Sequence, residues 1–274
     1  MNRLLLILFT VCWLSVSGQT SKNTSDNVPY WEIDTSPGVA KPLVIYMHGY
    51  RSYSGGRWIL PNSLDQIKNQ GPISVNADGT LKYPSPPALI ICPLLSSGSY
   101  SNDWINKLLD YCTSSYNITD IYLTGWSYGG GAVWDYISQA IPKYNVRGAA
   151  PIAGGYNTVS KAVNVKCKVW AFHGNADDVV PLSRTQSMYD AITCEKKLTV
   201  FEANHNISPW PFATSGFWEN KPYTADRIVN LYTWLFEGSE PIDPDPIPAT
   251  KQLYINGNAV CPWPDLGIQS IEVK

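Results

Sequence analysis

A serine lies at the centre of a glycine-rich segment, residues 125–129, with the sequence GWSYG. An apolar run at residues 121–124 precedes it, and a segment of helical character at residues 130–140 follows. A turn this tight strains the serine backbone and exposes its hydroxyl, and the flanking glycines let strand and helix pass closely. The serine amide then lies at a helix amino terminus, where negative charge is stabilised. The pattern predicts that Ser127 is a nucleophile, with a purely structural glycine turn as the alternative.

A serine hydroxyl needs a base within hydrogen-bond reach, and the chain contains only three histidines. His48 and His173 each precede a glycine at the end of an apolar run, whereas His205 follows the strand expected over residues 197–203. For a serine turn in a sheet of this kind, the chain order is serine, acid, histidine. We therefore predict that His205 is the base and that His173 supports the loop carrying the acid.

The acid is expected in the loop that leaves the strand at residues 168–172. Asp177 and Asp178 are adjacent there, and only one of the two side chains can point inward. We prefer Asp177, with Asp178 as the alternative. The carboxylate would orient His205 and stabilise the imidazolium that forms during attack.

Two backbone amides are needed where negative charge develops on a substrate oxygen. One is predicted to be the amide of Tyr128, which follows the nucleophile. The other is predicted to be the amide of Tyr50, in the loop after the strand expected at residues 43–47. These positions fall at carboxyl ends of strands, where open α/β sheets place their sites.

Apolar runs alternate with helical segments along the chain. The runs lie at residues 43–47, 88–92, 121–124, 148–154, 168–172 and 197–203. Continuous apolar strands are buried on both faces, so the pattern predicts an α/β fold with a mostly parallel sheet and helices on both faces. Residues 19–27 are polar and are expected to be disordered.

The ends of the chain of 274 residues differ in character from its middle. Residues 1–18 begin with a basic residue, continue with an apolar run too short to be a membrane span, and end with small residues. This pattern predicts a secretory signal peptide. We expect a secreted protein, extracellular or periplasmic, with a catalytic domain at residues 19–237. A proline- and acid-rich linker is predicted at residues 238–250, and a short β segment of an appended module at residues 251–274. With a net charge of −2 and no basic block, nothing indicates nucleic-acid binding.

Five cysteines would remain after removal of the predicted signal peptide. Cys167 and Cys194 each precede a predicted strand, so a disulfide between them at one sheet edge is expected; a Cys92–Cys112 bond is the weaker expectation. Cys261 is then left over. No cysteine has metal-ligand spacing to a histidine, so neither zinc nor another cofactor is expected.

Together these motifs resemble those of α/β-hydrolases. The likeness is to the secreted esterase group that includes polyhydroxybutyrate-depolymerase-like and feruloyl or acetyl-xylan esterase-like enzymes, with phospholipase/carboxylesterase and "predicted peptidase" relatives. The matching segments are PLVIYMHGY (42–50), LTGWSYGGGAVWDY (123–136), VWAFHGNADDVVP (169–181) and EANHN (202–206). The resemblance implies Ser127 as nucleophile, Asp177 as acid, His205 as base and residues 49–50 as the oxyanion loop.

The resemblance implies a serine esterase that acts through an acyl-enzyme. Secretion and the abundance of aromatic residues, 11 Trp and 17 Tyr, favour acetyl or feruloyl esters on plant polysaccharides, because aromatic faces suit sugar and phenolic rings. Several aromatic residues lie on loops predicted near the site, among them Tyr53, Trp58, Tyr100 and Trp104. Trp126 and Trp210 are the predicted substrate contacts. A lipase or polyester depolymerase would need an apolar binding face, a serine peptidase would keep the same triad, and a binding domain would lack a triad member. No sequence feature indicates an oligomeric state.

Overall fold

The computed structural model describes residues 19–77, 81–82, 86–155, 158–213, 231–236, 252–255 and 258–262. The chain divides into two units, Met1–Glu237 and Gly238–Lys274. The predicted signal peptide and linker lie outside the described residues. In the second unit, β11 (Gln252–Ile255) and β12 (Asn258–Pro262) form an antiparallel pair. Among the described residues, no helix is long and apolar enough to cross a membrane.

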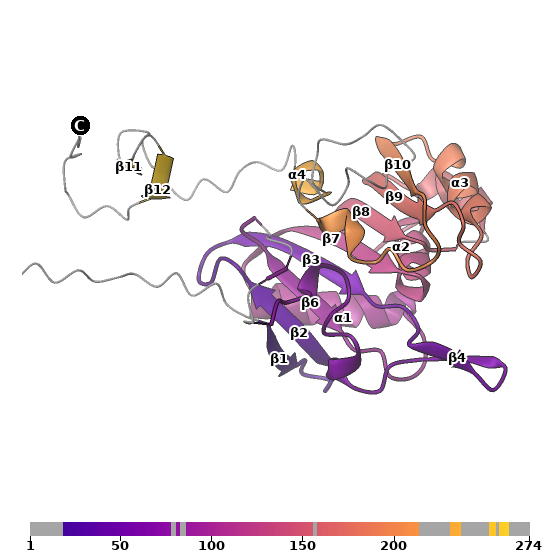
Figure 1. The fold of residues 1–274 in the computed structure, drawn as a ribbon, viewed down its shortest axis with the longest axis horizontal. Helices are drawn as coiled ribbons and strands as arrows, with labels where there is room; N and C mark the ends of the chain where they lie inside the picture. Colours follow the sequence, from indigo (N-terminus) through magenta and orange to yellow (C-terminus); the bar gives the residue numbers. More distant parts are fainter. Residues whose placement is uncertain are drawn as a thin grey trace, which may run out of the picture. The chain divides into compact units, whose positions relative to one another are not determined.

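An eight-stranded sheet forms the centre of the first unit, in the order β1-β2-β6-β3-β7-β8-β9-β10 (Figure 1). The strands are β1 (Thr20–Asn23), β2 (Pro29–Asp34), β3 (Lys41–Met47), β6 (Leu89–Pro93), β7 (Ile118–Trp126), β8 (Val146–Ile152), β9 (Lys168–Gly174) and β10 (Lys196–Phe201). All neighbours from β6 to β10 are parallel, whereas the β1–β2 and β2–β6 pairs are antiparallel. The predicted mostly parallel sheet is confirmed.

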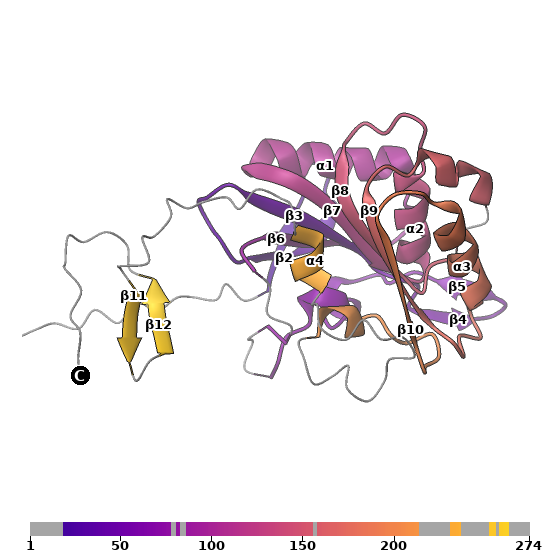
Figure 2. The same ribbon diagram turned by 90° about the horizontal axis from the view of Figure 1, so that it is seen from above.

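Helices cover both faces of this sheet (Figure 2). The helices are α1 (Asn102–Ser115), α2 (Tyr128–Ile137), α3 (Leu182–Ala191) and α4 (Leu231–Phe236). One core cluster holds buried residues of α1, α2 and α3, among them Leu109, Trp134 and Met188. The other cluster, on the opposite face, holds Trp234 and Leu235 of α4. Short 3-10 helices occupy Leu64–Gln66, Gly71–Ile73, Val159–Asn164 and Trp210–Phe212.

The expected disorder at residues 19–27 is wrong, because part of this segment is the edge strand β1. Thr20 pairs with Glu32 of β2, and Lys22 forms an ion pair with Glu32 at 2.6 Å. All four side chains of β1 are exposed. Backbone pairing rather than burial holds this strand, so it carries no hydrophobic pattern.

A short hairpin, β4 (Ser52–Ser54) and β5 (Arg57–Ile59), projects from the body of the first unit (Figure 1). Gly55 and Gly56 join its strands with φ angles of 59° and 79°. Two consecutive residues at positive φ give the tight turn whose twist matches a two-stranded ribbon.

The four described cysteines form no disulfide. Cys92 and Cys112 belong to the two core clusters on opposite faces of the sheet, so the expected bond between them is wrong. Cys167 and Cys194 do lie together, lining one depression at the amino-terminal ends of β9 and β10, but their thiols are unbonded. The side chain of Cys261 lies outside the described part of the structure.

Candidate active site

Ser127 occupies the turn between β7 and α2 with φ 56° and ψ −114°. A positive φ is strained for a residue with a Cβ atom. The Ser127 amide donates to the Ile152 carbonyl at 2.9 Å, which anchors the turn on β8. The Ser127 side chain makes no capping hydrogen bond to α2, so its hydroxyl is available to another group.

The glycines on either side of Ser127 are required by close packing against β3. A Cβ atom on Gly129 would lie 2.0 Å from the Met47 carbonyl oxygen, and one on Gly125 would lie 2.7 Å from the same atom. The first turn of α2 therefore packs directly on the end of β3. This is the steric reason for the glycine–serine–glycine spacing.

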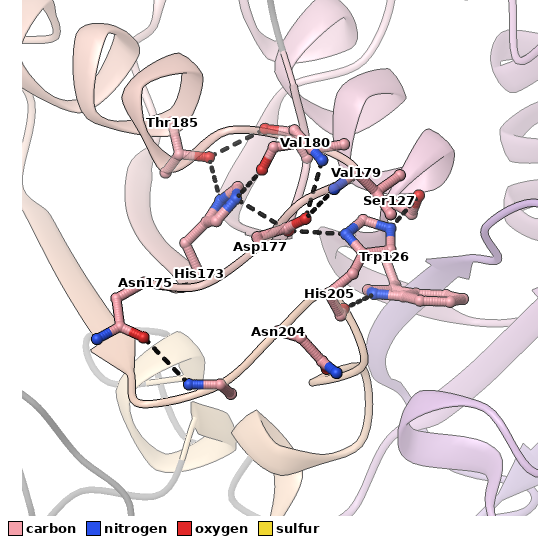
Figure 3. A network of polar contacts seen from close by, with 12 residues as sticks. Trp126, Ser127, His173, Asn175, Asp177, Val179, Val180, Thr185, Asn204 and His205 are labelled. Carbon is pink, nitrogen blue, oxygen red and sulfur yellow. Dashed lines mark hydrogen bonds and ion pairs between the residues drawn. The ribbon is translucent and has the colours of Figure 1, made fainter.

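The structure brings the serine, the histidine and the acid into one hydrogen-bonded chain (Figure 3). The Ser127 Oγ lies 2.7 Å from His205 Nε2, and His205 Nδ1 lies 2.7 Å from Asp177 Oδ2. In this arrangement Nδ1–H donates to the carboxylate, which leaves Nε2 to accept the serine proton. Asp177 is fully buried at its side chain and His205 is only 8% exposed, so little water competes for these bonds.

Backbone amides and a second histidine hold the Asp177 carboxylate. Oδ1 accepts hydrogen bonds from the amides of Val179 at 2.9 Å and Val180 at 2.8 Å, and Oδ2 lies 3.2 Å from His173 Nε2. Burial acts to raise the pKa of Asp177, but hydrogen bonds from His173, His205 and the Val180 amide outweigh it and hold the pKa well below its usual value. The adjacent Asp178 is exposed, so Asp177 is the carboxylate that contacts His205.

His173 fixes the acid loop to the start of α3. Its Nε2 donates to the Val180 carbonyl at 2.8 Å, and its Nδ1 lies 2.8 Å from Thr185 Oγ1. Thr185 in turn donates to the Gly154 carbonyl at 3.0 Å. The fully buried His173 side chain thus supports the acid loop, in the manner predicted for it.

The Tyr50 amide lies in the loop after β3, and the Tyr128 amide lies at the start of α2. Among the described residues, neither amide donates a hydrogen bond to another backbone group. His48 shapes the loop before Tyr50: its Nδ1–H donates to the Gly49 carbonyl at 2.8 Å, and its Nε2 accepts from the Leu95 amide at 2.9 Å. Burial lowers the pKa of His48 to about 4, against the opposing effect of the Gly49 hydrogen bond, so the ring is neutral near pH 7.

A cleft of 830 Å³ opens at Ser127. Its side chains are aromatic, polar and aliphatic, and the aliphatic ones are Ala132, Val179 and Val180. The aromatic ones are Tyr50, Trp58, Tyr100 and Tyr128; the polar ones are Ser99, Ser101, Asn102, Asp135 and Arg184. The cleft therefore combines flat apolar faces with hydrogen-bonding and charged groups. Of this lining, the sequence predictions assigned roles to Ser127 and, for their amides, to Tyr50 and Tyr128, and they placed Trp58 and Tyr100 on loops near the site.

The two tryptophans predicted to contact substrate do not line this cleft. Trp126 lies behind the triad, where its Nε1–H donates to the His205 carbonyl at 2.9 Å and its ring fills the space below Gly49. Trp210 is half-buried and packs edge-on against Phe201 at the border of a core cluster. Both rings belong to the supporting structure, whereas the side chains of Tyr50 and Tyr128 form the cleft wall.

No group of three metal-ligating side chains is assembled among the described residues.

Comparison with known proteins agrees with this architecture. Residues 95–203 match the model of a family described as an alpha/beta hydrolase of unknown function (DUF915). The matched segment contains Ser127 and Asp177 and ends just before His205. A solved structure of a thermostable esterase is similar to the chain with a TM-score of 0.55 and 19% identity, covering 80% of this chain. The chain has the α/β-hydrolase fold.

The chain spans 62% of the length of that thermostable esterase. Est1E from Butyrivibrio proteoclasticus is 14% identical, with a TM-score of 0.47 and coverage of 69% of this chain and 90% of that one. No curated protein matches the sequence. At these identities the likeness is one of fold, so the chemistry is argued from the site itself.

Proposed function

We propose that this α/β-hydrolase is a serine hydrolase that cleaves carboxylic esters. The observation that carries the proposal is the hydrogen-bonded chain from Ser127 Oγ through His205 to the buried Asp177, with both contacts at 2.7 Å. A serine paired with a neutral imidazole, whose other nitrogen is fixed by a carboxylate, is the arrangement that activates a hydroxyl for acyl transfer.

In the first half-reaction, Ser127 Oγ attacks the ester carbonyl carbon while its proton passes to His205 Nε2. The carbonyl oxygen gains the negative charge and accepts hydrogen bonds from the amides of Tyr50 and Tyr128. The intermediate collapses as the bond from carbon to the alcohol oxygen breaks, and His205 returns the proton to the departing alcohol. The products are the free alcohol and an acyl group bonded to Ser127.

In the second half-reaction, water attacks the acyl carbon and gives its proton to His205. The bond to Ser127 Oγ then breaks, His205 returns the proton to that oxygen, and the carboxylic acid leaves. Each amide donor aimed at the oxyanion is worth about 3 kcal/mol of barrier in such sites. Asp177 holds the required tautomer of His205 in both halves.

We infer that the substrates are acetyl or feruloyl esters on plant polysaccharides, hydrolysed outside the cell. The aromatic and polar lining of the cleft supports this class, because a sugar or phenolic ring presents a flat apolar face together with hydroxyl groups. The signal-like sequence at residues 1–18 supports secretion. A long acyl chain would be better matched by a wholly apolar cleft, as a lipase or polyester depolymerase requires.

Hydrolysis of a substrate panel by the full mature chain tests the proposal. The panel holds p-nitrophenyl acetate, p-nitrophenyl palmitate, methyl ferulate, acetylated xylan and a peptide p-nitroanilide. We expect rapid cleavage of the acetyl and feruloyl esters and its loss in Ser127→Ala but not in Ser187→Ala, a serine on the exposed part of α3. Preferential cleavage of the palmitate or of the anilide would contradict the proposed substrate class, and activity retained in Ser127→Ala would contradict the mechanism.

A further inference from the structure

Two exposed aromatic side chains lie on the projecting hairpin beside the cleft. Tyr53 on β4 is 59% exposed, and Trp58 on β5 is 46% exposed. They are directly opposite in the antiparallel register and touch edge to face, with ring centroids 5.0 Å apart. Cross-strand neighbours project from the same face of a hairpin. Rings this exposed contribute little to the stability of the fold, which favours a role in binding for them.

These rings continue into the cleft without a break. Trp58 stacks on Tyr50 at 6.0 Å, and Tyr50 stacks on Tyr128 at 4.5 Å with an interplanar angle of 26°. Tyr128 is the residue after Ser127. Tyr53, Trp58, Tyr50 and Tyr128 thus form an aromatic path from the exposed hairpin to the nucleophile.

We propose that the aromatic path binds an extended glycan chain and delivers one of its esterified sugars to Ser127. This inference rests on the proposed function and deepens it, because it assigns a binding surface for the polymer outside the reaction centre. Sugar rings have apolar faces that stack on Tyr and Trp, and successive rings along the path offer contact to more than one sugar.

The surroundings of the path favour a glycan over an aliphatic chain. Where the path enters the cleft, the lining adds Ser99, Ser101, Asp135 and Arg184. These groups match the hydroxyl rim of a sugar. Ser101 already accepts from the Trp104 amide and Asp135 lies 3.8 Å from Lys161, but the Arg184 guanidinium can donate to sugar hydroxyls, whereas an aliphatic acyl chain would offer it no acceptor, which is costly in a desolvated complex. The side chain of Arg184 forms no ion pair among the described residues, and it too faces an open cleft.

Binding and kinetics of Tyr53→Ala in the full mature chain test the inference. Ile141→Ala is the matched control, because Ile141 is 91% exposed and lies outside both the cleft and the hairpin. We expect Tyr53→Ala to lower kcat/KM on acetylated xylan about fivefold to tenfold, mainly by raising KM. The ratio of kcat/KM on acetylated xylan to kcat/KM on p-nitrophenyl acetate should fall by a similar factor. Ile141→Ala should leave that ratio at the wild-type value.

A binding measurement separates this inference from the proposed function. In the Ser127→Ala background, retardation of the full chain in gels that contain soluble deacetylated xylan should be reduced by Tyr53→Ala and not by Ile141→Ala. If xylan does not retard the chain, or if it retards the Tyr53→Ala variant as strongly as the Ser127→Ala parent, the aromatic path is not a glycan site, even if small esters are cleaved. Adsorption to a polycaprolactone film that depends on Tyr53, in the absence of xylan binding, would also overturn the inference.

Discussion

The indole Nε1 of Trp126 donates a hydrogen bond to the backbone carbonyl of His205 at 2.9 Å. The two rings lie 5.1 Å apart at 38°. The residue before the nucleophile therefore holds the backbone of the residue that would deprotonate it. A side chain next to Ser127 in the sequence thus acts from behind the triad rather than from the cleft.

Trp126→Phe is expected to lower kcat about threefold to tenfold, because it removes one hydrogen bond that positions His205 and keeps most of the ring. KM should change little, since the indole does not line the cleft. Steady-state kinetics on p-nitrophenyl acetate measure both constants. Trp31→Phe is the matched control, because the indole of Trp31 likewise donates to a carbonyl, that of Leu64 at 2.8 Å. If Trp126→Phe changed KM more than kcat, Trp126 would contact the substrate, as the sequence predicted, and the positioning role would be wrong.

The pair Asp177→Asn and Asp178→Asn tests which carboxylate orients His205. An amide at position 177 can present N–H rather than oxygen to Nδ1, which disfavours the productive tautomer, so kcat should fall about 10³- to 10⁴-fold. Asp178 is exposed, and its amide variant should retain kcat within about twofold, as is usual for surface changes. Equal losses in the two variants would contradict the assignment of Asp177.

Removal of the Asp177 charge should also change the dependence of stability on pH. The folded pKa of this carboxyl lies below its unfolded value of about 3.9, so the charged form contributes stability above pH 4. That contribution is lost as the pH falls below 4 towards the folded pKa. We expect the free energy of unfolding of wild type to exceed that of Asp177→Asn by about 1–3 kcal/mol at pH 7, with a smaller difference at pH 3. Urea denaturation at the two pH values measures it, and a difference that grows at pH 3 would have the wrong sign.

His48 gives a second pH prediction, at milder acidity. Its pKa falls from about 6.5 in the unfolded chain to about 4 in the folded one, so the unfolded state takes up a proton first. The stability is complete above pH 6.5 and is lost as the pH falls towards 4. Between pH 7.5 and 5 the loss amounts to about 2 kcal/mol.

His48→Gln should not show this loss, since glutamine does not titrate while its oxygen can still accept from the Leu95 amide. The difference in unfolding free energy between wild type and His48→Gln should therefore shrink by about 2 kcal/mol from pH 7.5 to pH 5. Tyr100→Phe serves as control, because it removes a hydrogen bond to the His48 carbonyl and leaves the ring in place. A His48→Gln variant with the wild-type slope would show that His48 is not the titrating group.

Sequence reasoning predicted the parallel core strands and the positions of Ser127, Asp177 and His205 at strand ends. It succeeded there because continuous apolar runs identify strands buried on both faces, and because the chain order of the three groups restricts the choice among few histidines. It failed at β1, whose four side chains are all exposed and which depends on backbone pairing with β2. Such pairing leaves no periodic trace in the sequence.

The cleft lining could not be predicted in the same way. A pattern shows that an aromatic residue is near Ser127, but the path of the chain decides whether its ring faces the cleft or the core, as Trp126 and Tyr128 illustrate. The hairpin that carries Tyr53 and Trp58 did leave a signal, since Gly55 and Gly56 form a two-glycine turn between short strands. That signal locates the hairpin, whereas the stacking of Trp58 on Tyr50 follows only from the fold.

Covalent labelling with a fluorophosphonate tests the central claim most directly. The reagent phosphonylates a serine only when a neighbouring base activates it, and mass spectrometry of the digested chain locates the adduct. The structure predicts a single adduct on Ser127, absent in Ser127→Ala, strongly slowed in His205→Asn and unaffected in Ser187→Ala. An adduct on a different serine, or labelling of Ser127→Ala at the wild-type rate, would show that the hydrogen-bonded chain from Ser127 to Asp177 is not the reaction centre.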